Sequence, residues 1–279
     1  MRLIALLLAI LLPLPAMAAD TPAPEIAYDR VMRTGVLRCG YIVYPPEIIK
    51  DANTGTLSGT IYDLTNEAAK QLELKVEWTS EVGFADMFEG LYNGKYDALC
   101  SGLWESPARA RSALFTIPIN YGVYHAFVRN DDTRFDNDLS LLNNPTVTIA
   151  VIDGEYGDVV AKESYPQAKT LRLPQLSDIS QLLASVAAHK ADVAFLQLGT
   201  ARGYIEHNPG QLRALAKHPV RVMPAPALAV ARSEQQLKNL LDTSFRYLLN
   251  NGEVERVLRH YNPELDSYNL IALPYQTMP

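Results

Sequence analysis

The feature that most constrains the fold is the alternation of short apolar stretches with amphipathic stretches along the chain. In the first half, the predicted strands cover residues 36–40, 76–78 and 96–100, and the predicted helices cover residues 26–34, 64–72 and 84–91. Asp63 is the predicted N-cap of the helix at 64–72, and Asn93-Gly94 ends the helix at 84–91. Strands that alternate with helices pair in parallel through right-handed crossovers, so the sequence predicts an α/β fold.

The second half repeats this alternation and then returns. An extended apolar run, residues 121–128, leaves the first set of elements, and a predicted strand at 147–151 opens a second set. Another extended stretch, residues 225–230, leads back to two C-terminal amphipathic helices. The sequence therefore predicts two α/β units connected by two extended crossovers.

A loop with a helix start follows the strand at 96–100. Ser106 and Pro107 have the form of a helix N-terminus, a hydroxyl cap with proline at the first helical position, so Arg109 lies in the first turn. The helix dipole disfavours a cation there, and an arginine beside free backbone N–H groups suits a carboxylate. The alternative is a solvated arginine with no ligand.

The stretch from Tyr96 to Asn120 resembles the signature of the family 3 periplasmic solute-binding proteins, the polar amino acid class. It has a buried strand, Ser101-Gly102, a four-residue turn, Pro-x-Arg-Ala-Arg, and Phe115-Thr-Ile-Pro118. The resemblance implies a type II periplasmic-binding fold, with two lobes that each hold a mostly parallel sheet flanked by helices. Lobe I would comprise residues 26–126 and 225–279, and lobe II residues 127–224.

The same resemblance implies a function. The protein would capture a small carboxylate-bearing solute, an amino acid or a related organic acid, by closing its lobes as a Venus flytrap, and would deliver it to an inner-membrane ABC permease. In the family, the arginine that matches Arg109 grips the α-carboxylate of the ligand. The other implied ligand-binding residues are Tyr41, Tyr44, Ser101, Gly102, Trp104, Ser106, Tyr156 and Gln197.

Two positions depart from the amino-acid-binding pattern. Gln197 stands where an aspartate holds the ligand's ammonium, and Tyr156 stands where a threonine or serine supports the carboxylate. Glutamine supplies no charge, so an ammonium would need Asp153, Glu155 or Glu105 instead. A plain organic acid is the open alternative.

Several aromatic residues are predicted near the ligand. The stiff Pro45-Pro46 pair presents Tyr44, and Tyr41 is a rival for the same role, while Glu47 stands where the family commonly has phenylalanine. Packing against the surface of the lobe is the alternative for both tyrosines. Trp104 could stack on a flat ligand or only reduce the size of the pocket.

The N-terminus and the cysteines concern the compartment. Residues 1–18 have the form of a secretory signal peptide, because an apolar run from Leu3 to Leu14 precedes the small-x-small cleavage site Ala16-Met17-Ala18. The run is shorter than the ~20 residues of a membrane span, so we expect a soluble periplasmic protein that begins at Ala19. A retained membrane anchor is the alternative.

Cys39 and Cys100 end strands that are neighbours in the family's sheet, which allows either a disulfide or two buried thiols.

Other functions find little support. The net charge of −6 gives no reason to expect nucleic acid as a partner. The five histidines are scattered, so we expect no metal site. We also expect a monomer with no cofactor and no enzymatic activity. Two alternatives stay open. One is a dehydratase-like enzyme that acts on prephenate-like acids with Glu105 or Glu155 as general acid. The other is a non-transport accessory or sensor module in the periplasm.

Overall fold

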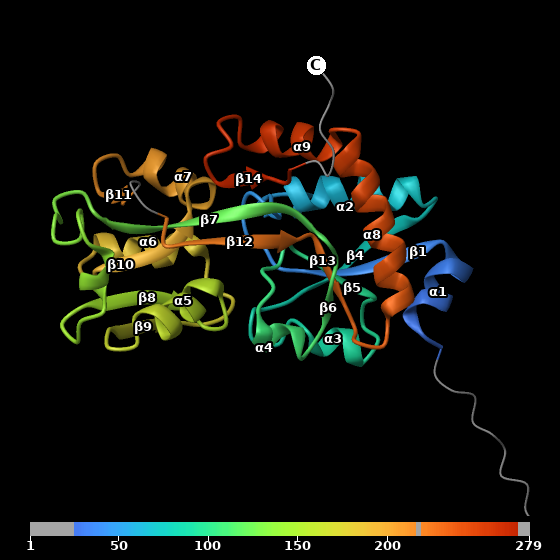
Figure 1. Cartoon of the computed structure of the whole chain (residues 1–279), viewed down its shortest axis with the longest axis horizontal. Helices are drawn as coiled ribbons and strands as arrows, with labels where there is room; N and C mark the ends of the chain where they lie inside the picture. The colour runs from blue at the N-terminus through green and yellow to red at the C-terminus, as the bar shows by residue number, and fades with distance from the viewer. Residues whose placement is uncertain (1–24, 216–218, 273–279) are drawn as a thin grey trace, which may run out of the picture.

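The computed structural model describes residues 25–215 and 219–272 of the 279-residue chain. The predicted signal peptide, residues 1–18, lies outside the described residues. Within the described ranges, no helix combines the length and apolar character that a membrane span requires. The chain folds into two lobes, each with its own sheet (Figure 1).

Lobe I is built on a five-stranded sheet. Its strands, in spatial order, are β4 (Lys75–Glu81), β1 (Val36–Tyr41), β5 (Ala98–Cys100), β13 (Leu228–Val230) and β6 (Leu114–Phe115). A two-stranded hairpin, β2 (Ile49–Lys50) and β3 (Leu57–Ser58), lies outside this sheet. The helices of the lobe are α1 (Ala27–Thr34), α2 (Thr60–Gln71), α3 (Glu89–Tyr92), α4 (Pro107–Ala110), α8 (Gln235–Asn250) and α9 (Glu253–Tyr261). Apolar side chains of α2, α8 and α9 pack together over β1 and β5 in one core.

Lobe II has a larger sheet with a core on each face. Its strands follow the order β11 (Leu212–Ala214), β7 (Pro118–Arg129), β10 (Val193–Gln197), β8 (Thr148–Ile152) and β9 (Lys169–Leu173). The helices are α5 (Tyr156–Ser164), α6 (Ile179–Ala187) and α7 (Leu198–His207), and a short 3-10 helix spans Leu139–Leu142. The side chains of α5 pack in one core, and those of α6 and α7 pack in the other.

The hinge between the lobes is a β-ribbon. The long strand β7 pairs antiparallel with β12 (Arg221–Pro226) and with β14 (Tyr268–Leu270), and β7 and β12 run side by side from one lobe to the other (Figure 1). The prediction of mostly parallel sheets is therefore correct for β1, β4 and β5, and for β8, β9 and β10. Both sheets are mixed because the crossover strands β7 and β13 join them antiparallel.

Two predicted helices have different bounds. Helix α2 begins at Thr60 after Gly59, which has a φ of 122°, so Asp63 lies in its first turn and is not the N-cap. The Asp63 carboxylate instead accepts a hydrogen bond from the Tyr261 hydroxyl of α9 at 2.9 Å. The helix predicted at 84–91 is the single turn α3, since the preceding residues form a loop that reaches the space between the lobes.

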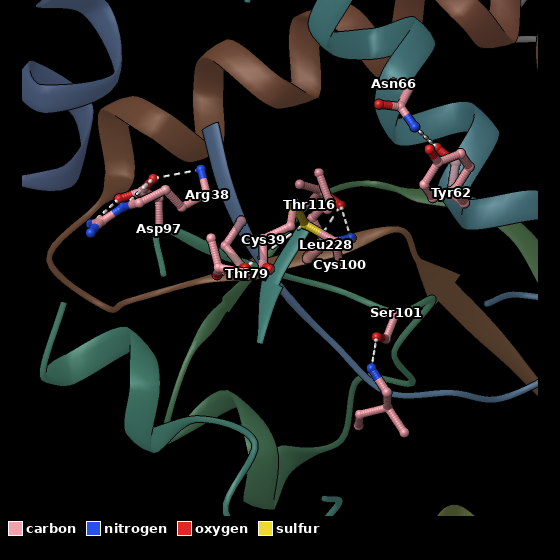
Figure 2. The surroundings of a disulfide bond; sticks show 12 residues. Arg38, Cys39, Tyr62, Asn66, Thr79, Asp97, Cys100, Ser101, Thr116 and Leu228 are labelled. Atoms are coloured by element: carbon pink, nitrogen blue, oxygen red, sulfur yellow. Dashed lines mark hydrogen bonds and ion pairs between the residues drawn. A yellow bond between two sulfur atoms is a disulfide. The ribbon is translucent and has the colours of Figure 1, made fainter. Parts of the chain in front are cut away.

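Cys39 and Cys100 form a disulfide between β1 and β5. Their Cα atoms lie 5.7 Å apart, and Figure 2 shows the bridge beside Thr116 and Leu228. Thr116 Oγ1 donates a hydrogen bond to the carbonyl of Leu228, which ties β13 to the segment that follows β6. The disulfide thus fixes the central strands of lobe I from which the predicted ligand loops emerge.

Candidate interlobe site

The predicted site lies between the lobes, where β1, β5 and β8 end at their carboxyl sides. Ligands of α/β sheets bind at such strand ends because the loops that follow them converge there. The residues that line the space between the lobes are Ile42, Tyr44, Phe84, Ser101, Gly102, Leu103, Trp104, Arg109, Glu155 and Tyr156. The structure therefore brings together Tyr44, Ser101, Gly102, Trp104, Arg109 and Tyr156 of the predicted set.

Arg109 spans the cleft from lobe I to lobe II. The hydroxyl of Ser106 caps α4 by accepting a hydrogen bond from Arg109 N at 3.2 Å, as the sequence predicted. The guanidinium donates through Nη1 to the carbonyl of Trp104 at 3.0 Å and through Nη2 to the carbonyl of Gly154 at 3.0 Å. Burial lowers the pKa of Arg109, and the nearby carboxyl of Glu155 opposes that shift. A positively charged fork therefore lies in the cleft with only carbonyls as hydrogen-bond acceptors.

The other polar groups of the first loop are used by the protein itself. Ser101 Oγ accepts a hydrogen bond from the Ile42 N–H at 2.7 Å, and the N–H of Gly102 donates to the carbonyl of Ala227 at 3.1 Å. Gly102 has a φ of 60°, a conformation that favours glycine. Ser106 is engaged in its cap and does not line the cleft. Gly102 therefore lines the cleft, but its N–H is already paired within lobe I.

Three aromatic rings form a box, and two of them, Trp104 and Tyr156, line the cleft. The rings of Trp104 and Tyr156 stack with centroids 5.4 Å apart, and Tyr124 stands perpendicular to both, 4.8 Å from Trp104 and 5.4 Å from Tyr156. Gly122 makes room for the indole, because a Cβ at that position would lie 2.0 Å from Trp104. The space left among the lining side chains is about 10 Å³, close to the smallest that holds one water molecule. A solute can therefore bind only if these rings separate.

The two candidate tyrosines of the first loop have different locations. Tyr44 lines the cleft and meets the ring of Phe84 edge-on at 5.9 Å. Tyr41 belongs to the core of lobe I, where its ring packs edge-on against Trp78 at 6.0 Å. The structure does not bring Tyr41 to the cleft, because it belongs to β1 and Tyr44 follows in the loop.

Glu155 provides a buried carboxyl group at the floor of the cleft. It is 1% exposed and caps α5 by accepting a hydrogen bond from the N–H of Gly157. Its Oε1 accepts hydrogen bonds from the hydroxyls of Tyr124 at 2.7 Å and Tyr44 at 3.3 Å. Burial raises the pKa of Glu155, and the Tyr124 hydrogen bond and Arg109 oppose this shift.

Gln197 lies behind the aromatic box. It ends β10, is fully buried, and its Oε1 accepts a hydrogen bond from Thr200 at 3.4 Å. Its Nε2 has no hydrogen-bond partner among the described residues and lies close to Gly122. Gln197 is thus adjacent to the cleft but does not line it.

Sequence reasoning missed several lining residues. The sequence predicts Phe84 in a helix. An aromatic side chain that follows so soon after strand β4 is nevertheless a usable signal of a residue that lines the cleft. Tyr124, which packs behind the lining rings of Trp104 and Tyr156, is predicted only as part of an extended crossover, and alternation alone does not show which of its faces is turned toward the cleft. For metals, the described residues contain no cluster of three or more His, Cys, Asp or Glu side chains that could hold an ion.

Comparisons with known proteins identify the family. The family described as bacterial extracellular solute-binding proteins, family 3, matches residues 37–264. The amino-acid-binding protein AabA of Dichelobacter nodosus is 25% identical over 214 residues, which are 75% of this chain and 81% of that protein. A probable histidine-binding protein of Campylobacter jejuni is 26% identical over 155 residues, 55% of this chain and 57% of that protein.

Solved structures share the fold. The ancestral amino acid-binding protein AncCDT-1, a precursor of cyclohexadienyl dehydratase, has a TM-score of 0.73 at 24% identity, covering 85% of this chain and 99% of that one. A mutant of ArgBP from T. maritima has a TM-score of 0.73 at 22% identity, covering 86% of this chain and 100% of that one. The fold is thus that of the type II periplasmic binding proteins. The chain belongs to family 3 of the bacterial extracellular solute-binding proteins.

Proposed function

We propose that the protein captures a small carboxylate-bearing solute, an amino acid or a related organic acid, in the periplasm and presents it to an ABC importer. The observation that carries this proposal is the position of Arg109. Its guanidinium reaches from α4 in lobe I to the carbonyl of Gly154 in lobe II, with no carboxylate in salt-bridge range among the described residues. An arginine fork suits a carboxylate because both oxygens can be bound at once.

Binding would proceed by opening and closing of the hinge. The rings of Trp104 and Tyr156 belong to opposite lobes, so separation of the lobes exposes Arg109 between them. The carboxylate of the solute would then replace the carbonyls of Trp104 and Gly154 as partner of the guanidinium. Closure would bring lobe II onto the solute, and the closed form is the state that an importer or a sensor recognises.

Two further observations support an exported amino-acid-binding protein. Relatives of this chain are named amino-acid-binding and histidine-binding proteins. Residues 1–18 have the pattern of a cleavable signal peptide, which would direct the chain to the periplasm. An accessory or sensor role would use the same capture step with a different partner.

The test compares ligand binding by the mature protein with ligand binding by two arginine variants. A thermal-shift screen of amino acids and organic acids, followed by calorimetry, is expected to find at least one carboxylate-bearing ligand. Arg109→Ala should weaken its binding by about 100-fold, because two hydrogen bonds to a charged group are lost. Arg111→Ala is the matched control, since Arg111 lies two residues away and is exposed. Equal affinities of Arg109→Ala and the wild type would refute the carboxylate anchor.

A second candidate function is supported by the carboxyl of Glu155. A buried acid with a raised pKa, close to an arginine in an enclosed cleft, is a suitable general acid for a dehydratase-like reaction. Long incubation of the protein with prephenate-like acids should then consume them. Recovery of the unaltered acids, despite measurable binding, would leave solute capture as the function.

A further inference from the structure

We infer that Ser267 and Asp266 form a latch that holds the two lobes in the closed form and slows the release of the solute. Neither residue lines the cleft, so the latch acts on closure and not through contact with the solute. The inference goes beyond the proposed function, because it gives residues outside the cleft a part in capture. It rests on that function only for the measurement that uses a solute.

One edge of the hinge strand β7 is interrupted where the lobes meet. Strand β12 pairs with residues 118–124 of β7 and occupies one edge there. Strand β14 pairs with residues 120–122 and β10 pairs with residues 124–128, so both lie on the other edge. The two strands therefore meet end to end beside Val123, whose N–H donates to the carbonyl of Ser267 at 3.0 Å. A bend of β7 at this point moves one lobe relative to the other.

The elements on the two sides of this interruption belong to different lobes. Leu265 and Tyr268 pack in the core of lobe I, so the loop before β14 moves with that lobe. Leu198 and Ala201 of α7 pack in a core of lobe II. Figure 1 shows the loop before β14 reaching toward α7. A contact between this loop and α7 is therefore a contact between the lobes.

Two polar interactions connect the loop to α7. Ser267 Oγ accepts a hydrogen bond from the Gly199 N–H at 2.5 Å, and Asp266 pairs with Arg202 at 2.7 Å. The N-cap residue of α7, Gln197, makes no cap hydrogen bond with its own side chain. Ser267 is fully buried and thus caps the N-terminus of α7 from the other lobe.

Gly199 allows the close approach of the loop and the helix. A Cβ at position 199 would lie 2.8 Å from Ser267 Oγ, so a larger residue pushes the loop and the helix apart. The space left in the cleft is about 10 Å³, so this contact belongs to the closed form. A hydrogen bond is lost when donor and acceptor separate beyond about 3.5 Å, so a small rotation of the lobes at Val123 breaks the latch. The latch therefore stabilises the closed form relative to the open form.

The experiment measures the release of a solute and the shape of the solute-free protein. Wild type, Ser267→Ala and Gly199→Ala are prepared as mature chains. Stopped-flow fluorescence measures the dissociation of a solute found in the thermal-shift screen, and small-angle X-ray scattering measures the radius of gyration. Both variants should release the solute about fivefold faster than wild type, which is the effect expected when a helix loses its cap. Without solute, both should have a larger radius of gyration.

The ion pair of the latch is expected to contribute less than the cap. The side chains of Arg202 and Asp266 are 33% and 35% exposed, so water screens their attraction. Asp266→Asn keeps the size of the side chain and removes its charge. The solute should therefore leave this variant faster than wild type but more slowly than it leaves Ser267→Ala.

Two comparisons separate the latch from general damage to the fold. Ser244→Ala is the matched control, because the Ser244 hydroxyl is also buried and donates to the carbonyl of Ala68 at 2.8 Å within lobe I. It should lower the stability toward urea and leave the release rate and the radius unchanged. Gly199→Ala places a better helix former in α7, so faster release from this variant does not come from a weaker helix.

Release that is unchanged or slower in both Ser267→Ala and Gly199→Ala would overturn the inference, although solute capture would stand. The inference is also wrong if Ser244→Ala accelerates release as much as Ser267→Ala does. If no carboxylate-bearing solute binds, the proposed function fails and the radii decide on the latch. In that case, a larger radius in both variants supports the latch, and radii equal to that of wild type refute it.

Discussion

Glu47 is a buried carboxyl group beneath the loop that carries Tyr44. It is 6% exposed, its Oε1 accepts a hydrogen bond from the hydroxyl of Tyr268 at 3.1 Å, and its Oε2 has no partner among the described residues. Burial raises its pKa from an ordinary value of 4.5 to about 7, with the Tyr268 hydrogen bond opposing the shift. Glu47 is thus an acid that favours its neutral form below about pH 7.

This pKa predicts a pH-dependent stability. The folded state binds the Glu47 proton more tightly than the unfolded state, so the free energy of unfolding should fall as the pH rises from 4.5 to about 7 and then level off. The loss from this group is about 3 kcal/mol. Glu47→Gln should therefore be more stable than wild type at pH 8 and similar at pH 4.5, as measured by urea unfolding. An equal difference at both pH values would contradict the assignment.

Individual residues also mark where sequence reasoning was sufficient. Ser106, Pro107 and Arg109 were predictable because a cap, a proline and an arginine at fixed spacing are local signals. Tyr41 and Tyr44 could not be distinguished from the sequence. They are three positions apart, and this small separation places one ring in the core of lobe I and the other in the cleft. The direction of Glu155 was equally inaccessible, because it depends on two tyrosines from distant parts of the chain.

At the scale of elements, the disulfide connects the two central strands of lobe I. The bridged residues are 61 positions apart, so in the chain-entropy model the bond stabilises the fold by about 4 kcal/mol. The double variant Cys39→Ala, Cys100→Ala should lose this amount in chemical unfolding without reductant. Thiol titration of the unfolded, unreduced wild type should find no free thiol, and two thiols would contradict the bridge.

Helix α1 is attached to the sheet by a buried ion cluster. The Asp97 side chain is fully buried and pairs with Arg30 of α1 and with Arg38 of β1, at 2.8 Å for the latter. Figure 2 shows the pair of Arg38 and Asp97. Asp97→Ala leaves two arginines without their anion and should cost about 3 kcal/mol of unfolding free energy. The matched control Glu25→Ala breaks an exposed pair with Arg33 and should cost much less, because water screens such a pair. Similar losses in the two variants would show that burial of Asp97 does not matter.

Elements were predictable to the extent that their pattern was local. The alternation of strands and helices indicates the α/β class, and helices α8 and α9 were predictable from their apolar faces. Strands β11 and β14 were missed because each has three residues, too few for a period to appear. The predicted helix at 84–91 shortened to α3 because contacts between the lobes hold its first residues in a loop. Ala85 N–H, for example, donates to Gln175 Oε1 of lobe II at 2.8 Å.

At the scale of the whole molecule, separation of the Trp104 and Tyr156 rings by a bound solute should be visible in tryptophan fluorescence. The chain has two tryptophans: Trp104 stacks on Tyr156 across the cleft, whereas Trp78 stacks on Tyr62 inside lobe I. In Trp78→Phe, saturation with an amino acid that binds should change the emission, because Trp104 loses its contact with Tyr156. In Trp104→Phe the emission should stay constant. An unchanged spectrum in the first variant at saturation would mean that the rings stay together.

The hinge ribbon determines what kind of motion the lobes can make. Strand β7 has hydrogen-bonded neighbours on both sides. They include β12 and the C-terminal strand β14, and both pair with β7 antiparallel. A ribbon of paired strands bends out of its plane more easily than within its plane. Bending within the plane would shift one strand along the other and break the backbone hydrogen bonds between them. Successive openings should therefore follow one path and restore the same register of the two lobes. Tyr44, Tyr124 and Glu155 would then meet again after each cycle without a search through alternative orientations.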